Sequence, residues 1–207
     1  GIFFDLTNVD FKSMYPTIEV VHNWSPETLK STEIIDMHPK WLAKYSGNAV
    51  YVYDKKIGVI KTVTDLSHDS VTRKLILDWM AQRKRIRAAK NKTESLESQQ
   101  WGMKVLMNAL TGYHGLKWAG YGSVPIIAQT TGIGRYWLNV ACNFYLKKRD
   151  SDPIETDTDG IYITGEPHLA EINKVIRLLV PDQYRMDVIH IEPKKYDAGI
   201  FYAQKGY

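Results

Sequence analysis

Cysteine is almost absent from this sequence. Its one thiol, Cys142, excludes an internal disulfide framework and is typical of a protein from a reducing compartment, and no residues have the spacing of a zinc or redox motif. Apolar runs as long as a membrane span are also absent. The first residues, GIFFDLTNVD, have no basic flank and reach Asp5 too early for a secretory signal. We therefore expect a soluble, intracellular (cytoplasmic) protein with no membrane partner.

Internal repeats and low-complexity segments are missing too. Of the 207 residues, 44% are hydrophobic and 24% are charged, which is the balance of a globular protein with a substantial core. The length fits one large domain or two small ones. A formal charge of +4 permits a polyanionic partner without requiring one, so the distribution of charge is more informative than its sum.

The apolar pattern predicts a mixture of strands and helices. An apolar and aromatic run ends near Asp10 as a strand, and Pro16 suits the first turn of a short helix that follows. Apolar residues recur at helical spacing over 69–89 and again through 101–110, which predicts two helices in an antiparallel hairpin. The other predicted elements are a short strand at VYVY (50–53), helices over 128–148 and 167–180, a strand over 185–191, a β-hairpin around TDTDG with Gly160 in its turn, and a last hairpin near 195–204.

Three carboxylates are placed where two strands end. Asp10 follows the first strand, and Asp157 and Asp159 lie at the tip of the predicted TDTDG hairpin. If these strands are neighbours in one sheet, the carboxylates approach the same spot. Hard divalent cations bind such oxygens, and Mg²⁺ needs only one or two protein carboxylates because water and substrate phosphates complete its shell. The alternative is structural, since DTDG is also a favourable turn sequence.

A second pattern is cationic. The segment RKRIRAAKNK (83–92) has six basic residues and no acid, with Arg83, Arg87 and Lys90 at helical spacing on one face. Lys104 follows on the partner helix, where KVLMNALTGYHG (104–115) places polar groups at 104, 108 and 111 or 112 along one side. Such faces can meet phosphates, although an exposed cationic face is commonly just solvated. A helix with a glycine-rich end explains most of the second segment without any function.

Read in order, DFKSMYPTI, KVLMNALTG, DTDG and KKY resemble motifs A, B and C and the lysine–tyrosine motif of family B DNA polymerases, closest to the archaeal type. HNWSPETL and the RKRIR helix are also similar to that family, so the resemblance covers nearly the whole chain. It implies an α+β fold: an antiparallel-sheet palm with helices on one face and a helical-hairpin fingers subdomain. The implied division is a first palm part over 1–66, fingers over 67–115, and a second palm part over 116–207.

The resemblance also implies roles for individual residues. Asp10 and Asp159 would bind two Mg²⁺ ions with help from the carbonyl of Phe11, and Asp157 would be a nearby acidic residue of the catalytic site. Tyr15 would lie beneath the incoming sugar and exclude a 2′-hydroxyl by a steric clash. A tyrosine that only packs in the core is the alternative for this residue.

Further residues would bind nucleotide and DNA. Fixed cations can neutralise charge on a triphosphate without reorganising, and a lysine or tyrosine beside the duplex can bind its backbone without reading sequence. The resemblance assigns the nucleotide (dNTP) role to Arg83, Arg87, Lys104 and Asn108, a weaker fingers contact to Gln100, and the primer-template DNA role to Lys194, Lys195 and Tyr196.

The sequence departs from the family pattern in two motifs. Motif B usually reads Asn-Ser-x-Tyr-Gly, whereas Thr111 stands at the tyrosine position here and Tyr113 lies elsewhere on the helix. The missing tyrosine bears on base-pair checking and leaves the metal chemistry untouched. In motif C a glycine follows Asp159, as in archaeal members, and Glu155 and Thr156 precede it in place of the usual tyrosine and small residue.

The expected activity is that of a DNA-directed DNA polymerase, a nucleotidyltransferase that extends a primer 3′-hydroxyl with deoxynucleotides. The chain begins with Gly1 and has no room for the exonuclease and thumb domains of that family, so we expect an excised fragment or one part of a split, DNA-associated polymerase. Two alternatives remain open at this stage. One is a non-catalytic nucleotide- or DNA-binding fragment, and the other is a different palm-based catalyst such as a reverse transcriptase or a cyclase.

Overall fold

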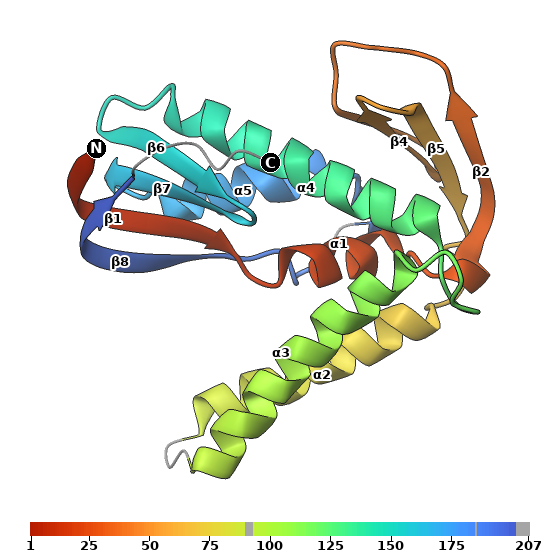
Figure 1. The fold of residues 1–207 in the computed structure, drawn as a ribbon, viewed down its shortest axis with the longest axis horizontal. Helices are drawn as coiled ribbons and strands as arrows, with labels where there is room; N and C mark the ends of the chain where they lie inside the picture. Colours follow the sequence, from red (N-terminus) through yellow and green to blue (C-terminus); the bar gives the residue numbers. More distant parts are fainter. Residues whose placement is uncertain (90–92, 185, 202–207) are drawn as a thin grey trace. The chain divides into compact units, whose positions relative to one another are not determined.

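The computed structural model describes residues 1–89, 93–184 and 186–201. It contains helices and antiparallel sheets, so the predicted α+β class is confirmed (Figure 1). The chain divides into two compact units, which we describe separately: unit 1 contains residues 1–12, 137–180 and those from 187 onward, and unit 2 contains residues 13–136 and 181–186. Within the described ranges, no helix combines the length and hydropathy needed to cross a bilayer.

Unit 1 is built on a four-stranded antiparallel sheet of order β6-β7-β1-β8. The first strand of the chain lies inside this sheet, between two strands that come from its last third. The elements of unit 1 are β1 (Ile2–Phe11), β6 (Ser151–Asp157), β7 (Gly160–Gly165), α5 (Leu169–Leu179) and β8 (Ile191–Ile200), together with the second part of α4 (Val124–Tyr145).

Side chains alternate between the two faces of β1. Val9 and Phe11 are buried on one face, where the ring of Phe11 stacks on Trp137 of α4 with 5.9 Å between centroids. Ile172 and Ile176 of α5 are also fully buried. The helices of unit 1 therefore cover one face of the sheet, and the opposite face of β1 presents Asp10.

Unit 2 has a second antiparallel sheet, of order β2-β5-β4-β3, and a long helical hairpin. The first part of α4 packs on this sheet through the buried amide of Gln129, which donates to the carbonyls of Val50 (3.2 Å) and Ile60 (2.8 Å). The elements of unit 2 are α1 (Met14–His22), η1 (Pro26–Thr28), β2 (Leu29–Ile35), β3 (Ala43–Ser46), β4 (Ala49–Asp54), β5 (Gly58–Thr64), α2 (Val71–Ala88), α3 (Glu94–His114) and η2 (Asp182–Tyr184).

The hairpin of α2 and α3 is the one that the helical spacing predicts. Ser70 caps α2, because its hydroxyl accepts from the N–H of Arg73 at 3.0 Å, and Thr93 caps α3 in the same way through Leu96. The carboxylate of Glu27 accepts from the N–H of Val71 at 2.8 Å and so places negative charge at the N-terminus of α2. Lys90, one of the predicted cations, lies outside the described residues.

Two predictions for the last third are wrong. Residues 187–190 form a turn and irregular chain in place of the predicted strand, and β8 begins only at Ile191. The described part of the predicted hairpin near 195–204 is a single strand through Ile200, and residues 202–204 lie outside the described ranges. The strand continues because β8 pairs with β1 up to Ile200, opposite Ile2; Gly199 fits closely within this pairing, since a Cβ there would come within 2.4 Å of Leu6 Cδ1.

His22 is fully buried in an aromatic cluster of unit 2. Its ring lies 4.3 Å from that of Trp24 and 5.5 Å from that of Tyr184. Nδ1 donates to the carbonyl of Ile18 at 2.7 Å, and Nε2 accepts from the hydroxyl of Tyr45 at 2.9 Å. Both nitrogens are therefore satisfied in the neutral ring, and burial lowers the pKa of His22 to about 4.

Acid is expected to destabilise the fold through His22. In the unfolded chain His22 has a pKa near 6.5 and binds a proton below that pH, whereas in the folded protein it stays neutral down to about pH 4. The free energy of unfolding therefore falls as the pH drops from about 6.5 to about 4. Between pH 7 and pH 4.5 this costs about 2 to 3 kcal/mol of unfolding free energy. Urea unfolding measures the unfolding free energy at both pH values. In His22→Gln the decrease between about pH 7 and pH 4.5 should be smaller than in the wild type by that amount, whereas the control His68→Gln, at an exposed position, should behave as the wild type does. Equal pH dependence in wild type and His22→Gln would contradict the assignment.

Candidate functional site

One row across the sheet of unit 1 carries three acidic side chains. In the strand register Asp10 of β1 lies opposite Gly160 of β7, which in turn lies opposite Asp157 of β6. On its other side Asp10 lies opposite Glu192 of β8. Residues that face each other across strands point to the same side of a sheet. The three carboxylates therefore share the face that the helices of unit 1 leave uncovered, with a glycine among them.

Asp159 joins this row from the turn between β6 and β7. Its carbonyl accepts from the N–H of Phe11 at 2.9 Å, so its backbone lies beside the residue that follows Asp10. Asp157 is two strands away from Asp10, which corresponds to roughly 10 Å between their Cα atoms. Of the two acids near this turn, Asp159 is therefore the one whose backbone lies beside the end of β1 that carries Asp10.

The turn that holds Asp159 is strained. Thr158 has φ 55°, a left-handed conformation that is unfavourable for a β-branched residue by on the order of 1–2 kcal/mol. Its hydroxyl donates to Asp157 Oδ1 at 3.1 Å. Strain of this kind persists where the surrounding structure enforces it, and it is concentrated at functional sites.

The sequence pattern predicted Gly160 in the turn. In the structure Gly160 is instead the first residue of β7. The glycine leaves room for the side chain of Asn8, because a Cβ on residue 160 would come within 2.4 Å of Asn8 Oδ1 as it is placed. This amide oxygen is buried and has no hydrogen-bond partner within the described ranges. An unsatisfied hard oxygen therefore lies next to the acidic row.

A cation already lies against these carboxylates. The ammonium group of Lys194 donates to Asp10 Oδ2 at 2.5 Å, which raises the pKa of Lys194, and the charge of Asp159 raises it further. Lys194 therefore lies near both acids. Its partner across β1 is Asn8, so it shares their face of the sheet.

The donor set fits Mg²⁺ rather than a metal held entirely by protein. Among the residues described, no group of three or more His, Cys, Asp or Glu side chains could hold a metal ion. Two carboxylates suffice for Mg²⁺ when substrate phosphates and water supply the other oxygens. Asp10 and Asp159 would therefore be the residues that hold such an ion.

The predicted DNA-contact residues lie along β8, at the edge of the sheet. Tyr196 shares the face of Asp10, and its ring lies 6.1 Å from that of Tyr162 on β7. Lys195 lies opposite Thr7 and therefore points to the other face. The structure brings Lys194 and Tyr196 to the acidic face and leaves Lys195 on the opposite one.

The remaining predicted site residues lie in unit 2. Tyr15 is half-buried at the start of α1, and a Cβ on Gly134 of α4 would come within 3.1 Å of its Cε1 atom. The glycine thus gives the ring room against the backbone of α4. Lys104 and Asn108 of α3 are exposed and lie one turn apart on the same side of the helix.

Arg83 of α2 is held in place by neighbours within unit 2. Its Nη2 and Nε donate to Gln100 Oε1 at 2.8 and 3.2 Å, and its Nη1 donates to the hydroxyl of Ser13 at 3.4 Å. Gln100, the weaker of the predicted contacts, therefore helps to orient this guanidinium. The position of Arg83 connects both helices of the hairpin to the start of α1.

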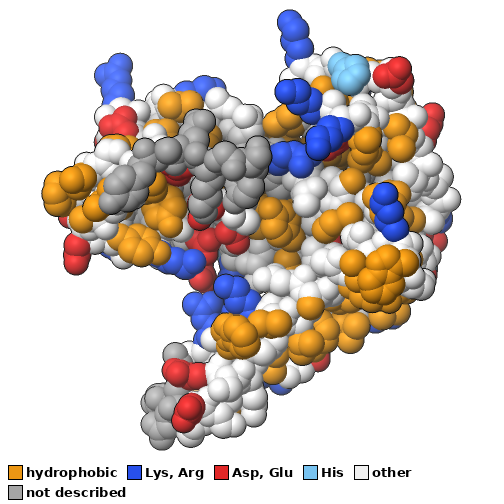
Figure 2. All heavy atoms as spheres, in the orientation of Figure 1, with side chains coloured by type: hydrophobic (Ala, Val, Ile, Leu, Met, Phe, Trp, Pro, Cys, Tyr) orange, Lys and Arg blue, Asp and Glu red, His pale blue; other side chains and the backbone are white. Residues whose placement is uncertain are grey.

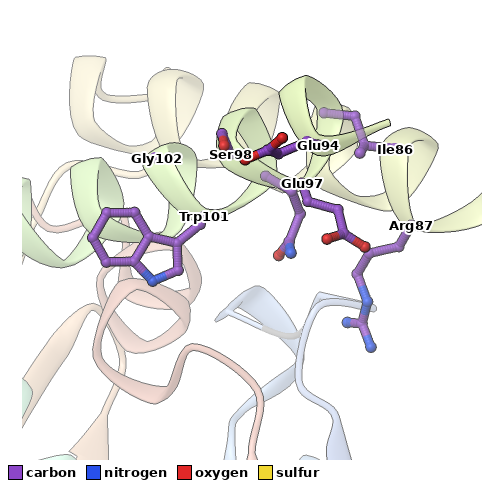
Figure 3. Close-up of a pocket in the computed structure, with 8 residues that line it drawn as sticks. Ile86, Arg87, Glu94, Glu97, Ser98, Trp101 and Gly102 are labelled. Carbon is purple, nitrogen blue, oxygen red and sulfur yellow. The ribbon is translucent and has the colours of Figure 1, made fainter. Parts of the chain in front are cut away.

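A groove on the hairpin contains Arg87. Figure 3 shows Glu97 and Trp101 projecting from α3 on the same side as Arg87 of α2, and Gln100 also lines the groove. Acidic side chains thus accompany the predicted cations here. Apolar side chains lie along the same hairpin in Figure 2, and Trp101 is 66% exposed. This surface is more mixed than the purely cationic face that the sequence pattern predicted.

Two residues of the acidic face were missed at the sequence level. Asn8 could have been found from the strand period, because it lies two residues before Asp10 and so on the same face. Glu192 could not be found from the local sequence, because only the pairing of β8 with β1 places it opposite Asp10. Its carboxylate forms an ion pair with Lys12 at 2.8 Å.

Comparison with known proteins identifies the family of this chain. The model of DNA polymerase family B matches residues 5–180, which include both strands of the carboxylate pair and the entire helical hairpin. The chain belongs to DNA polymerase family B. The alternative of a reverse transcriptase or a cyclase is set aside.

Relatives and a solved structure agree with this membership. A DNA polymerase of Pyrococcus glycovorans is 26% identical over 168 residues, covering 79% of this chain and 20% of that protein. A DNA polymerase of Paramecium bursaria Chlorella virus NY2A is 29% identical over 175 residues, covering 78% and 18%. The structure of the family B DNA polymerase from Pyrobaculum calidifontis has the same fold, with a TM-score of 0.60 at 22% identity, over 96% of this chain and 24% of that one. The chain thus spans about a fifth of the length of these family B relatives.

Proposed function

We propose that the chain is part of the catalytic core of a template-directed DNA polymerase. It would transfer deoxynucleotides from dNTP to a primer 3′-hydroxyl with two Mg²⁺ ions. The observation that carries the proposal is that the backbone of Asp159 is bonded to the end of the strand that carries Asp10, with the ammonium of Lys194 bonded to Asp10 and influenced by the charge of Asp159. Family membership supports the same reaction.

Asp10 and Asp159 are the residues that would hold the metal ions, with the carbonyl of Phe11 as a further oxygen and Asp157 as a nearby acidic residue of the catalytic site. Bound Mg²⁺ lowers the pKa of an attacking hydroxyl and neutralises charge on the reacting phosphate and the leaving pyrophosphate. Asn8 and Glu192 lie on the same face of the sheet and add oxygens beside Asp10.

Unit 2 carries the residues proposed for the nucleotide. Arg83, Arg87 and Lys104 would bind triphosphate oxygens, and Asn108 would add a neutral donor, because fixed cations stabilise charge that develops on phosphate without reorganising. The bond from Arg83 to Gln100 prepares this guanidinium before nucleotide arrives. Tyr15 would select deoxyribose by excluding a 2′-hydroxyl.

Primer-template DNA is the proposed macromolecular substrate. Lys194, Lys195 and Tyr196 would contact the duplex without reading its sequence. In this proposal residues 1–66 and 116–207 form the palm and residues 67–115 form the fingers. Exonuclease and thumb domains, in the same or another chain, would complete the enzyme.

Primer extension tests the proposal directly. The 207-residue chain is expected to add deoxynucleotides to a labelled primer-template in Mg²⁺, and a chelator should stop the addition. The second candidate is a non-catalytic fragment that binds nucleotide or DNA. Saturable dNTP binding without extension, even when the exonuclease and thumb segments are supplied, would favour that candidate and contradict the first.

A further inference from the structure

Three buried polar side chains join two helices of unit 2. Glu19 of α1 and His114 of α3 have no exposed surface, and His114 Nδ1 and Glu19 Oε1 form a hydrogen-bonded pair at 3.2 Å. The hydroxyl of Thr111, also on α3, donates to Glu19 Oε2 at 3.1 Å. Burial raises the pKa of Glu19, and its bonds to His114 and Thr111 act in the opposite direction. We call Glu19, Thr111 and His114 the helix-joining cluster.

The cluster lies one helical turn below the proposed nucleotide residues on both helices. Glu19 follows Tyr15 by four residues on α1, and Thr111 follows Asn108 by three residues on α3. Residues at these spacings are neighbours on successive turns of a helix. The hydrogen bond that holds Glu19 against Thr111 therefore also constrains the position of Tyr15 relative to Asn108.

Thr111 accounts for the departure in motif B. This residue stands where the family pattern has a tyrosine, yet its side chain is buried and turned toward Glu19, whereas Asn108 is exposed. Position 111 in this chain thus serves the contact between α1 and α3.

Stability alone does not explain the cluster. Burying a carboxylate and an imidazole is costly, and His114 Nε2 is left without a hydrogen-bond partner among the residues described. Apolar side chains of similar volume commonly match or exceed the stability of such a buried polar group. Directional hydrogen bonds, unlike apolar contacts, fix the register of one helix against another.

We propose that Glu19, Thr111 and His114 are positioning residues that set the spacing between Tyr15 on α1 and the Lys104–Asn108 side of α3. The inference rests on the proposed function and deepens it. Loss of the hydrogen bonds lets α3 move against α1, and a small displacement of binding groups weakens nucleotide binding strongly.

The decisive variant is the apolar triple Glu19→Met, Thr111→Val and His114→Phe. Its affinity for dATP with Mg²⁺, measured by calorimetry on the 207-residue chain, is expected to fall about tenfold. Its thermal midpoint is expected to equal or exceed that of the wild type. Thr131→Val is the matched control and should bind as the wild type does, because among the described residues the Thr131 hydroxyl bonds only to the carbonyls of Ile127 and Ala128 in its own helix.

If the triple variant does not fold, two single substitutions of Thr111 test the same proposal. Thr111→Ser keeps the hydroxyl and should retain nucleotide affinity, whereas Thr111→Val should weaken it. Wild-type affinity in the folded triple variant, or equal affinity in the valine and serine variants, would overturn the inference and leave the proposed function intact. A wild-type chain that binds no dATP would overturn both.

Discussion

Primer extension is expected to fall about a thousandfold or more when Asp159 is replaced by asparagine. The substitution keeps the size of the side chain and removes one of the two charges that would hold Mg²⁺. Loss of roughly 4 kcal/mol of transition-state stabilisation corresponds to this factor. Rates should be compared at saturating dNTP and primer-template, with the chain alone or supplied with the proposed exonuclease and thumb segments.

Asp152→Asn provides a matched control for this measurement. Asp152 is exposed on the same β-hairpin, five residues before Asp157, and takes no part in the acidic row. The control should extend primers at the wild-type rate. If Asp159→Asn retains activity while its circular dichroism shows a native fold, the assignment of the metal site is wrong.

Removal of the Tyr15 ring should relax the choice of sugar. If the ring excludes a 2′-hydroxyl, Tyr15→Ala is expected to raise the relative incorporation of ribonucleotides about a hundredfold, a change of roughly 3 kcal/mol in discrimination. The packing of Tyr15 against Gly134 supports this role, because a ring held in one place can act as a barrier. The measurement is the ratio of kcat/KM for dATP and ATP with one primer-template.

Tyr15→Phe separates the steric role from any role of the hydroxyl. The phenylalanine variant keeps the ring and should discriminate as the wild type does. If Tyr15 only packs in the core, Tyr15→Ala will lower the thermal midpoint and leave the ratio unchanged. That outcome would rule out the steric gate.

Local sequence patterns predicted the helical hairpin, the first strand and the turn between β6 and β7. The helical period of apolar residues gave the hairpin of α2 and α3, and the apolar run before Asp10 gave β1. The TDTDG segment gave the turn between β6 and β7. These predictions succeeded because helix spacing and turn chemistry act within a few residues.

Features that depend on distant partners could not be predicted in this way. β2 is largely exposed and shows no alternation of buried and exposed residues, so only its pairing with β5 reveals it as a strand. Pro193 and Gly199 argue against a long strand, yet β8 runs through both at the edge of a sheet, where proline is tolerated. Glu19 gives no sign of burial in the sequence, because its partners are more than ninety residues away.

The number of divalent cations bound at Asp10 and Asp159 tests the central claim most directly. Titration of the chain with Mn²⁺ in the presence of dATP, followed by electron paramagnetic resonance, should show about two bound ions. Asp10→Asn and Asp159→Asn should each abolish tight binding, while Asp152→Asn should leave it unchanged. Undiminished Mn²⁺ binding in a variant that carries both Asp10→Asn and Asp159→Asn would contradict the account.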